Sequence, residues 1–393
     1  MSDVQQSFDA HQILDAVLTG APEASGALAT VRPEVLAQTR SAYDALYRAP
    51  QALPARVLHA LAAVTADWQG SGVLADWHRA HGASPELTAA DPLSSDPALA
   101  ALRDQVDLLS ISPALATLAD QQQLTAVGHD SRTVVLISQL VAFESYLQRL
   151  VAGLAALHGL DLPSADAPTR TPRSRGRVAA HGGATPTGRT RPAAFTRDQL
   201  QWEPWIPVPS EDELTEEQRA SFASKASTNS VYFRMLSLTP GVTRARSELD
   251  NAIFLPRDGM PKAERELAAA VTSKVNDCIY CASVHARKAA GFSKREEEVD
   301  ALLAAQLERN ADWISADLAP LAEGQDERWS AIVTAAAELS RPRPALGAAH
   351  LEALRAQGLD DHEITDLLTA SAFFAWANRL MLSLGDPSLP DAA

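Results

Sequence analysis

Hydrophobic positions recur along this chain at spacings of three and four residues, the spacing that places them on one face of a helix. Residues 263–275 show the pattern most clearly, with an apolar face that consists of Leu267, Ala270, Val271 and Val275. Similar patterns predict helices over residues 327–339, 350–356 and 361–384. No pair of alternating segments joined by turn residues indicates a β-hairpin. The pattern therefore predicts an all-α fold.

The segment after residue 275 predicts two more helices in close succession. Asp277 can cap a helix over residues 278–290, and Gly291 can end it. Ser293 and Glu296 have the spacing of a capping box, which would start the following helix. The composition agrees with a helical chain, because aromatic residues make up only 5% of it while Ala and Leu dominate.

The two halves of the chain match each other in two registers, each defined by a constant difference in residue number. In the register offset by 230, the matched pairs include Leu124 and Leu354, Gly128 and Gly358, Asp130 and Asp360, Phe143 and Phe373, and Arg149 and Arg379. In the register offset by 207, Val64-Thr65 matches Val271-Thr272 and His78 matches His285. Because the blocks recur in the same order, the sequence predicts a tandem repeat of one helical domain.

A segment of different composition separates the two halves. Residues 163–194 hold five Pro, four Gly and six Arg but only one acidic residue, and they lack apolar periodicity. We expect a flexible linker; the alternative is that its arginines dock on an acidic surface of the same protein. The predicted organisation is a degenerate domain without cysteine at 1–162, the linker at 163–194 and a cysteine-containing domain at 195–393.

Charge and hydropathy narrow the classes of partner. The formal net charge of −15 disfavours binding to nucleic acid or to an anionic membrane surface. The N-terminal sequence MSDVQQSFDAHQ lacks the basic and apolar regions of a secretory signal. The most apolar run, residues 134–143, is too short to cross a membrane. We therefore expect a cytoplasmic protein that binds neither nucleic acid nor membranes.

The only two cysteines of the chain, Cys278 and Cys281, are three residues apart. A disulfide between cysteines this close in sequence cannot close a long loop. In a reducing compartment such a pair indicates redox chemistry or metal ligation. His285 falls on the same helical face, and Glu266 lies on the preceding predicted helix. The first helical turn would favour a thiolate at Cys278. His285 can accept the proton of Cys281, and Glu266 can orient the imidazole.

A thiolate with a second thiol one turn away can reduce a peroxide, because the first sulfur becomes a sulfenic acid that the second converts to a disulfide. The same residues have other interpretations. The two cysteines could be buried hydrophobic residues, or half of a zinc site that recruits His285 plus Glu266 or a distant histidine. Tyr280 is expected to pack against a neighbouring helix, with a proton-relay role as the alternative. We expect no metal ion and no bound cofactor, only a redox-active Cys278–Cys281 disulfide.

The spacing E-x11-C-x2-C-x3-H resembles the AhpD-like alkylhydroperoxidases of the carboxymuconolactone decarboxylase superfamily. The surrounding segments DNAIF, AERELAAAVTSKVNDCIYCASVHARKAAG and AFFAWANRLMLSLG resemble its peroxidase-related branch, and the likeness covers about residues 194–386. The resemblance implies an all-helical homo-oligomer, a trimer or larger, that reduces a hydroperoxide and is itself reduced by a thiol or lipoyl-type protein.

The resemblance also implies roles for single residues. Cys281 would be the peroxidatic cysteine and Cys278 the resolving one, while His285 and Glu266 would form the proton relay. Tyr280 stands where the AhpD proteins have a histidine that joins this relay, which leaves the proton path and the natural reductant open.

The first half resembles a companion domain of the same superfamily, but it lacks the dithiol. In the register offset by 207, Glu266 falls on His59, Cys278 on Ser71, Cys281 on Leu74 and His285 on His78. We therefore expect no thiol chemistry in this half, and a role in assembly or in shaping the entrance to the other site.

Together these residues predict a thiol-dependent peroxidase for organic hydroperoxides or hydrogen peroxide. A general thiol–disulfide oxidoreductase would use the same dithiol. A lactone decarboxylase or binding protein of the same fold would not need it, and neither would a purely structural assembly module.

Overall fold

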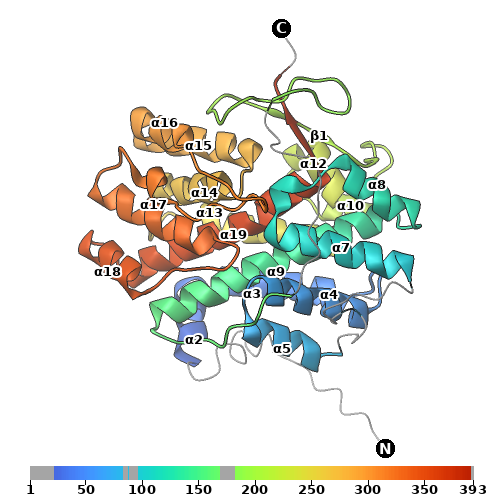
Figure 1. The fold of residues 1–393 in the computed structure, drawn as a ribbon, viewed down its shortest axis with the longest axis horizontal. Helices are drawn as coiled ribbons and strands as arrows, with labels where there is room; N and C mark the ends of the chain where they lie inside the picture. Colours follow the sequence, from blue (N-terminus) through green and yellow to red (C-terminus); the bar gives the residue numbers. More distant parts are fainter. Residues whose placement is uncertain (1–21, 83–86, 88–95, 169–181, 391–393) are drawn as a thin grey trace, which may run out of the picture.

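The structure of this chain is a computed structural model that describes residues 22–82, 87, 96–168 and 182–390. The N-terminal segment without a signal pattern and the middle of the predicted linker, residues 169–181, lie outside the described residues. Within the described residues the chain forms α-helices, two short 3-10 helices and one two-stranded sheet (Figure 1). The predicted all-α fold is confirmed.

The described helices are divided between the two halves. The first half contributes α2 (Pro22–Val31), α3 (Pro33–Tyr47), α4 (Ala55–Trp68), α5 (Gly72–Ala80), α7 (Pro97–Ile111), η1 (Pro113–Leu115), α8 (Leu118–Ala126) and α9 (Ser131–Leu157). The second half contributes α10 (Glu216–Ala220), α11 (Lys225–Thr228), α12 (Val231–Leu236), α13 (Pro240–Phe254), α14 (Lys262–Val275), α15 (Ile279–Ser293), α16 (Glu296–Ala304), η2 (Ala319–Ala322), α17 (Glu327–Ser340), α18 (Ala348–Ala356) and α19 (Asp361–Leu384). Strand β1 (Gln201–Pro204) pairs antiparallel with β2 (Gly385–Ser388), which ties the start of this half to its end.

The helix boundaries recur in the two registers of the predicted repeat. In the register offset by 207, both ends of α3 and α4 coincide with those of α13 and α14, and the start of α5 coincides with that of α15. In the register offset by 230, both ends of α8 coincide with those of α18, and the starts of α7 and α9 coincide with those of α17 and α19. The caps repeat as well, since Asp96 and Asp130 cap α7 and α9 as Asp326 and Asp360 cap α17 and α19.

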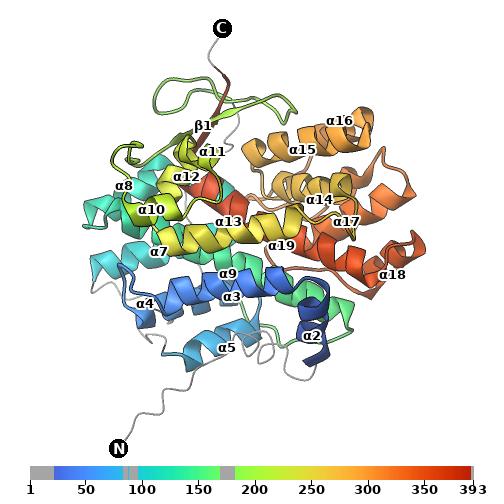
Figure 2. The ribbon, with the colours of Figure 1, turned by 180° about the vertical axis from the view of Figure 1, so that it is seen from behind.

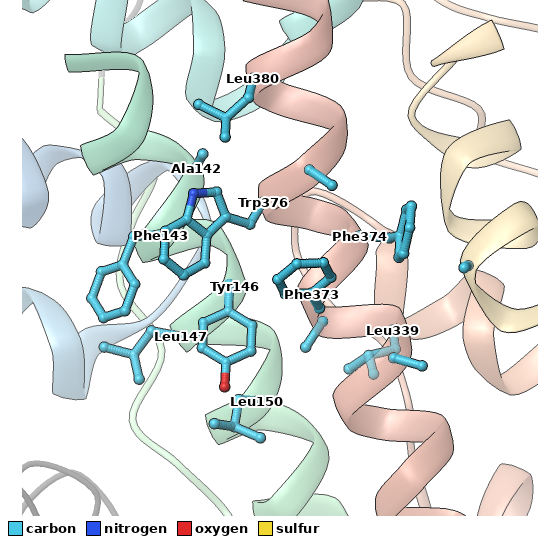
Figure 3. Packing of buried hydrophobic residues seen from close by; sticks show 14 of the residues in the cluster. Ala142, Phe143, Tyr146, Leu147, Leu150, Leu339, Phe373, Phe374, Trp376 and Leu380 are labelled. Carbon is cyan, nitrogen blue, oxygen red and sulfur yellow. The ribbon is translucent and has the colours of Figure 1, made fainter. Parts of the chain in front are cut away.

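The two repeats share one hydrophobic core. The long helices α9 and α19 pack along each other more extensively than any other described pair, and the matching helices α3 and α13 also lie side by side (Figure 2). Figure 3 shows Trp376 of α19 between side chains of α9, where its ring meets Phe143 edge-on at 5.2 Å and Tyr146 at 5.8 Å between centroids. Its indole N–H donates to Oε1 of Gln139 (2.8 Å). The two halves of the chain are therefore in direct contact through α9 with α19 and α3 with α13.

Helices α9 and α19 are also the two described helices long and apolar enough to cross a membrane. Their most apolar windows are 89% and 94% buried inside the protein, however. That burial is typical of core helices in a soluble protein.

The described parts of the predicted linker are attached to the body of the protein. The carbonyl of Pro163 accepts a hydrogen bond from the first residue of α5 (3.0 Å). Arg189 pairs with Glu203 (3.3 Å), and Arg191 pairs with the buried carboxylate of Asp386 (2.8 Å). The structure therefore shows these two arginines paired with acidic residues of the same chain.

The end of α15 differs from the prediction made from its glycine. The helix continues through Gly291 and ends where Lys294 adopts a left-handed conformation (φ 64°). Ser293 is therefore still helical, and its hydroxyl donates back to the carbonyl of Ala289 (2.7 Å). The predicted capping box is wrong, because Arg295 takes the N-cap position of α16 and makes no side-chain cap.

Candidate active site

Cys278 and Cys281 lie where the turn after α14 becomes helix α15. Asp277 was predicted to cap this helix, but it adopts a left-handed conformation (φ 61°) and its carboxylate accepts a hydrogen bond from the Trp313 indole (2.8 Å). Cys278 therefore takes the N-cap position, and the backbone N–H of Cys281 donates to its sulfur. Both cysteines are free thiols, and they are 1% and 6% exposed.

Burial controls the protonation of Cys278. It raises the pKa of the thiol well above its ordinary value, and interactions with the Cys281 thiol and with Asp277 act in the same direction. The backbone N–H of Cys281 lowers this pKa but does not compensate. Desolvation therefore opposes the thiolate that the helix terminus was expected to favour at Cys278.

His285 and Glu266 form a buried pair beside the thiols. Nδ1 of His285, on α15, lies 2.5 Å from Oε2 of Glu266, on α14, and the two side chains are 12% and 1% exposed. Because a carboxylate only accepts hydrogen bonds, the proton of the imidazole is on Nδ1 and the lone pair is on Nε2. Lys288 lies 3.6 Å from the other carboxylate oxygen.

The environment sets the charge of this pair at neutral pH. Burial lowers the pKa of His285 and outweighs the opposing effect of Glu266. Burial alone would raise the pKa of Glu266, but the hydrogen bond from His285 and the positive charge of Lys288 bring it below its ordinary value. A neutral imidazole beside a carboxylate is the state that can accept a proton from a thiol.

Aromatic rings surround the imidazole and limit its contact with water. The ring of Phe374 meets His285 edge-on at 4.2 Å between centroids, and Phe254 lies at 5.9 Å. Tyr280 is half-buried and packs against the hydrophobic core, as expected, and burial raises the pKa of its hydroxyl. The structure thus brings the four predicted residues and Tyr280 into one region.

Two residues of this region were missed from the sequence, Tyr232 on α12 and Arg246 on α13. The guanidinium of Arg246 lies 5.9 Å from the centre of the Tyr232 ring and 4.9 Å from that of Phe373. Its side chain is only 5% exposed, and it contacts Asp250 at 3.5 Å. One signal was available, because Arg246 stands at a core-facing position of an amphipathic helix, four residues after the buried Val242.

The matching region of the first half contains a different buried network. Nδ1 of His78 lies 3.0 Å from Nδ1 of His59, and its Nε2 lies 3.1 Å from Glu144. The hydroxyl of Tyr47 donates to the other oxygen of the same carboxylate (2.5 Å). The carboxylate partner of the histidine therefore comes from α9 in this half, whereas Glu266 comes from α14.

The positions of the protons in this network follow from the carboxylate. Glu144 accepts from Nε2 of His78, so Nδ1 of His78 accepts in turn from Nδ1 of His59. Burial, followed by the charges of His78 and His81, lowers the pKa of His59 to about 3. His59 is therefore neutral at physiological pH. Ser71 caps α5 and accepts a hydrogen bond from the N–H of Leu74 (3.4 Å), the same geometry that Cys278 and Cys281 adopt in α15.

A cavity of about 680 Å³ opens behind the dithiol turn. Its lining includes Asp277, Lys274, Arg309 and the aromatic rings of Phe195 and Trp313, but neither cysteine. Lys274 is buried beside the Phe195 ring, and burial lowers its pKa to about 8. The cavity is therefore separate from the two thiols, although Asp277 is shared between its wall and the turn.

Comparisons with known proteins found one family model and solved structures to which this chain is similar. Residues 240–317 match the model of the carboxymuconolactone decarboxylase family, and this segment contains the glutamate, both cysteines and the histidine of the site. No curated protein matches the chain. A crystal structure described as an alkylhydroperoxidase AhpD core, an uncharacterized peroxidase-related protein from Ralstonia eutropha JMP134, is 22% identical. The match covers 46% of this chain and 88% of that one, with a TM-score of 0.36.

Proposed function

We propose that this chain, whose residues 240–317 belong to the carboxymuconolactone decarboxylase family, is a thiol-dependent peroxidase that reduces hydroperoxides through a dithiol–disulfide cycle. The observation that carries the proposal is the buried His285–Glu266 pair on the two helices that frame Cys278 and Cys281. A dithiol alone would serve many functions. A dithiol beside an oriented neutral imidazole is suited to generating a thiolate in a site that excludes water.

The first step is attack by Cys281. His285, four residues further along the same helix, accepts the thiol proton at Nε2 directly or through a water molecule. The thiolate attacks the terminal oxygen of the hydroperoxide, so an S–O bond forms and the O–O bond breaks. The leaving alkoxide recovers the proton from the imidazole and departs as an alcohol. Cys281 is oxidised to a sulfenic acid, and the hydroperoxide is reduced.

The second step belongs to Cys278. Its raised pKa keeps it a protonated thiol while Cys281 reacts, which suits the resolving role. Its sulfur then displaces hydroxide from the sulfenic acid, and its own proton leaves with that hydroxide as water. The resulting Cys278–Cys281 disulfide is reduced by two electrons and two protons from an external dithiol.

The cycle needs no metal ion and no bound cofactor beyond this disulfide. We propose a thiol or lipoyl-type protein as the reductant, and the cytoplasm as a compartment that is reducing enough to supply it. We also propose a homo-oligomer, a trimer or larger, as the resemblance to AhpD-like proteins implies. The net charge of −15 argues against a nucleic acid or an anionic membrane as partner.

Mass spectrometry of the intact chain after one equivalent of cumene hydroperoxide or hydrogen peroxide tests the proposal. We expect a disulfide in the wild type, a stable sulfenic acid at Cys281 in Cys278→Ser and no oxidation by the peroxide in Cys281→Ser. Peroxide consumption that survives Cys281→Ser would contradict it. If the wild type does not react with peroxide but its thiols exchange rapidly with small-molecule disulfides, the result would support a thiol–disulfide oxidoreductase instead.

A further inference from the structure

Two buried hydrogen-bond donors near the dithiol have no partner within the described residues. They are the hydroxyl of Tyr232, on α12, and the Nε–H of Arg246, on α13. Buried donors in folded proteins are nearly always satisfied, so an unpaired one requires an explanation. Two such donors on residues that are close in space indicate a site where a polar ligand would accept their hydrogen bonds.

The two donors belong to the wall that also holds the imidazole. The guanidinium of Arg246 lies over the ring of Phe373, at 4.9 Å from its centroid. The rings of Phe373 and Phe374 are 5.8 Å apart, and Phe374 packs on His285 at 4.2 Å. A continuous row of side chains therefore leads from Tyr232 to the proposed base.

Electrostatics link the same donors to the sulfur atoms. Burial raises the pKa of the Tyr232 phenol, Arg246 opposes this, and the charges of Cys281 and Cys278 raise it further. The phenol thus lies within electrostatic reach of both thiols. It stays protonated at physiological pH, and a protonated phenol is a hydrogen-bond donor.

The charge of Arg246 is only partly neutralised. Its one described carboxylate contact is with Asp250, four residues further along α13, at 3.5 Å and with 38% of that side chain exposed. The first half has a paired side chain at the position that matches Arg246. At the position matching Arg246 in the register offset by 207 stands Thr39, whose hydroxyl is paired with that of Tyr146 (2.6 Å). At this position, therefore, the unpaired donor occurs in the half that has the dithiol.

A ligand for this place must offer acceptor oxygens to two donors while one of its atoms reaches a thiol. Its remaining body must fit among aromatic rings. We infer that Tyr232 and Arg246 hold the O–O group of the hydroperoxide substrate against Cys281, an inference that rests on the proposed function. The Tyr232 hydroxyl donates to the oxygen that leaves as alkoxide, and the Arg246 cation stabilises the negative charge that develops on it.

The arrangement changes no part of the electron balance. The thiolate of Cys281 still supplies the electron pair that forms the S–O bond and breaks the O–O bond. The proton that His285 took from the thiol still ends on the alkoxide. Tyr232 and Arg246 contribute hydrogen bonds and positive charge at the moment when the alkoxide forms, which makes both of them catalytic residues for this step.

Comparison of two reagents at the same thiol isolates this role. Iodoacetamide needs the thiolate but has no O–O bond, whereas a hydroperoxide needs both the thiolate and the stabilised leaving group. We expect Tyr232→Phe to slow oxidation of Cys281 by cumene hydroperoxide about tenfold or more, and to change the rate of alkylation less than about twofold. Arg246→Gln should show the same split with a larger effect on the peroxide rate.

Tyr146→Phe is the matched control, because it removes a buried phenol hydroxyl from the half without cysteines. It should leave both rates at their wild-type values. Thermal unfolding reports whether each variant is folded. Should Arg246→Gln fail to fold, Tyr232→Phe decides by itself, since it deletes one unpaired oxygen and keeps the ring.

The possible failures are distinguishable. If the wild type is alkylated but does not react with peroxide, the proposed function is wrong and this inference falls with it. If the wild type reacts with peroxide and Tyr232→Phe reacts equally fast, only the inference is wrong. A Tyr232→Phe variant that slows both reagents equally would also overturn it, because Tyr232 would then act on the thiol and not on the peroxide.

Discussion

Arg149 and Arg379 make the same contact between the two repeats in opposite directions. Arg149, on α9, donates to the carbonyl of Arg341 at the end of α17 (2.7 Å). Arg379, on α19, donates to the carbonyls of Leu109 and Ser110 in the last turn of α7 (3.0 and 3.1 Å). Both side chains are fully buried. Each arginine thus caps a helix of the other repeat, where the helix dipole favours a cation.

Replacing either arginine by methionine should destabilise the whole chain. The change keeps much of the volume but leaves helix-terminal carbonyls buried without donors, which costs roughly 2–4 kcal/mol of unfolding free energy. Chemical denaturation of Arg149→Met and Arg379→Met measures the loss. Arg355→Met is the control, because this arginine is 45% exposed and pairs with an exposed aspartate, so its loss should cost less than about 0.5 kcal/mol.

The reciprocal geometry makes the test specific. If the repeats were independent, each arginine would stabilise only one half, and unfolding of the variants would separate into two transitions. Because the α9–α19 core is shared, we expect a single transition that shifts as a whole. A two-step transition in either variant would show that the two halves unfold separately and do not share one core.

Glu266→Gln should slow the chemistry of Cys281 without changing the fold. The glutamate raises the pKa of His285, so its removal lowers that pKa further. Glutamine can donate as well as accept, so it no longer fixes the Nδ1–H tautomer. We expect the rate of Cys281 alkylation at neutral pH to fall by about 10- to 100-fold. An NMR titration of His285 should show the imidazole protonating at lower pH than in the wild type.

Glu264→Gln provides the matched control on the same helix. Glu264 is a buried carboxylate two residues earlier on α14, where it is paired with Arg328 (2.8 Å), so its loss should affect stability more than thiol reactivity. Equal alkylation rates in Glu266→Gln and the wild type would show that His285 does not need this carboxylate.

His59 should make the stability of the protein depend on pH. Its pKa of about 3 lies far below the value of 6.5 expected in the unfolded chain. As the pH falls from 6.5 toward 3, only the unfolded chain binds this proton, so stability decreases by up to about 1.4 kcal/mol per pH unit. His59→Gln should flatten this slope. His285, whose pKa burial also lowers, adds a dependence of the same sign that the variant retains.

Urea denaturation between pH 4 and pH 7 measures both slopes. The slope gives the number of protons that the chain takes up on unfolding. We expect this number to be larger in the wild type than in His59→Gln by up to one proton. Parallel curves would show that the folded chain protonates His59 as readily as the unfolded chain does.

Two cysteines introduced into the first half should behave as a dithiol. Ser71 and Leu74 have the N-cap hydrogen bond that Cys278 and Cys281 have in α15. In a chain whose native cysteines are replaced by serine, Ser71→Cys with Leu74→Cys should therefore close a disulfide when treated with diamide. The number of titratable thiols in the folded protein would fall from two to none. Two persistent thiols would show that the turns differ in geometry.

Much of the fold was determined by the sequence alone, because helix formation depends on nearby residues. The periodic pattern predicted a helix over 361–384, and the structure has α19 at Asp361–Leu384. The repeat was readable for the same reason, since both copies keep their helix starts and apolar faces at constant offsets. The grouping of Cys278, Cys281 and His285 follows from spacing on one helix, and Glu266 from the helix before it.

Tertiary packing decided what local pattern could not. Asp277 was predicted as a cap, but it bonds Trp313, which is 36 residues away, and so Cys278 became the N-cap. The raised pKa of Cys278 depends on how deeply the turn is buried, and burial is a property of the whole core. Arg246 is placed beside Tyr232 by helices that meet only in the folded chain.

The same division separates the two copies of the site. The sequence alone showed that the first half lacks both cysteines and keeps His78. Only the folded structure shows that Glu144, 66 residues further along the chain, supplies the carboxylate that Glu266 supplies in the other half. The sequence gives the type of each side chain, whereas the partner of a buried side chain depends on which helix packs against it in the folded core.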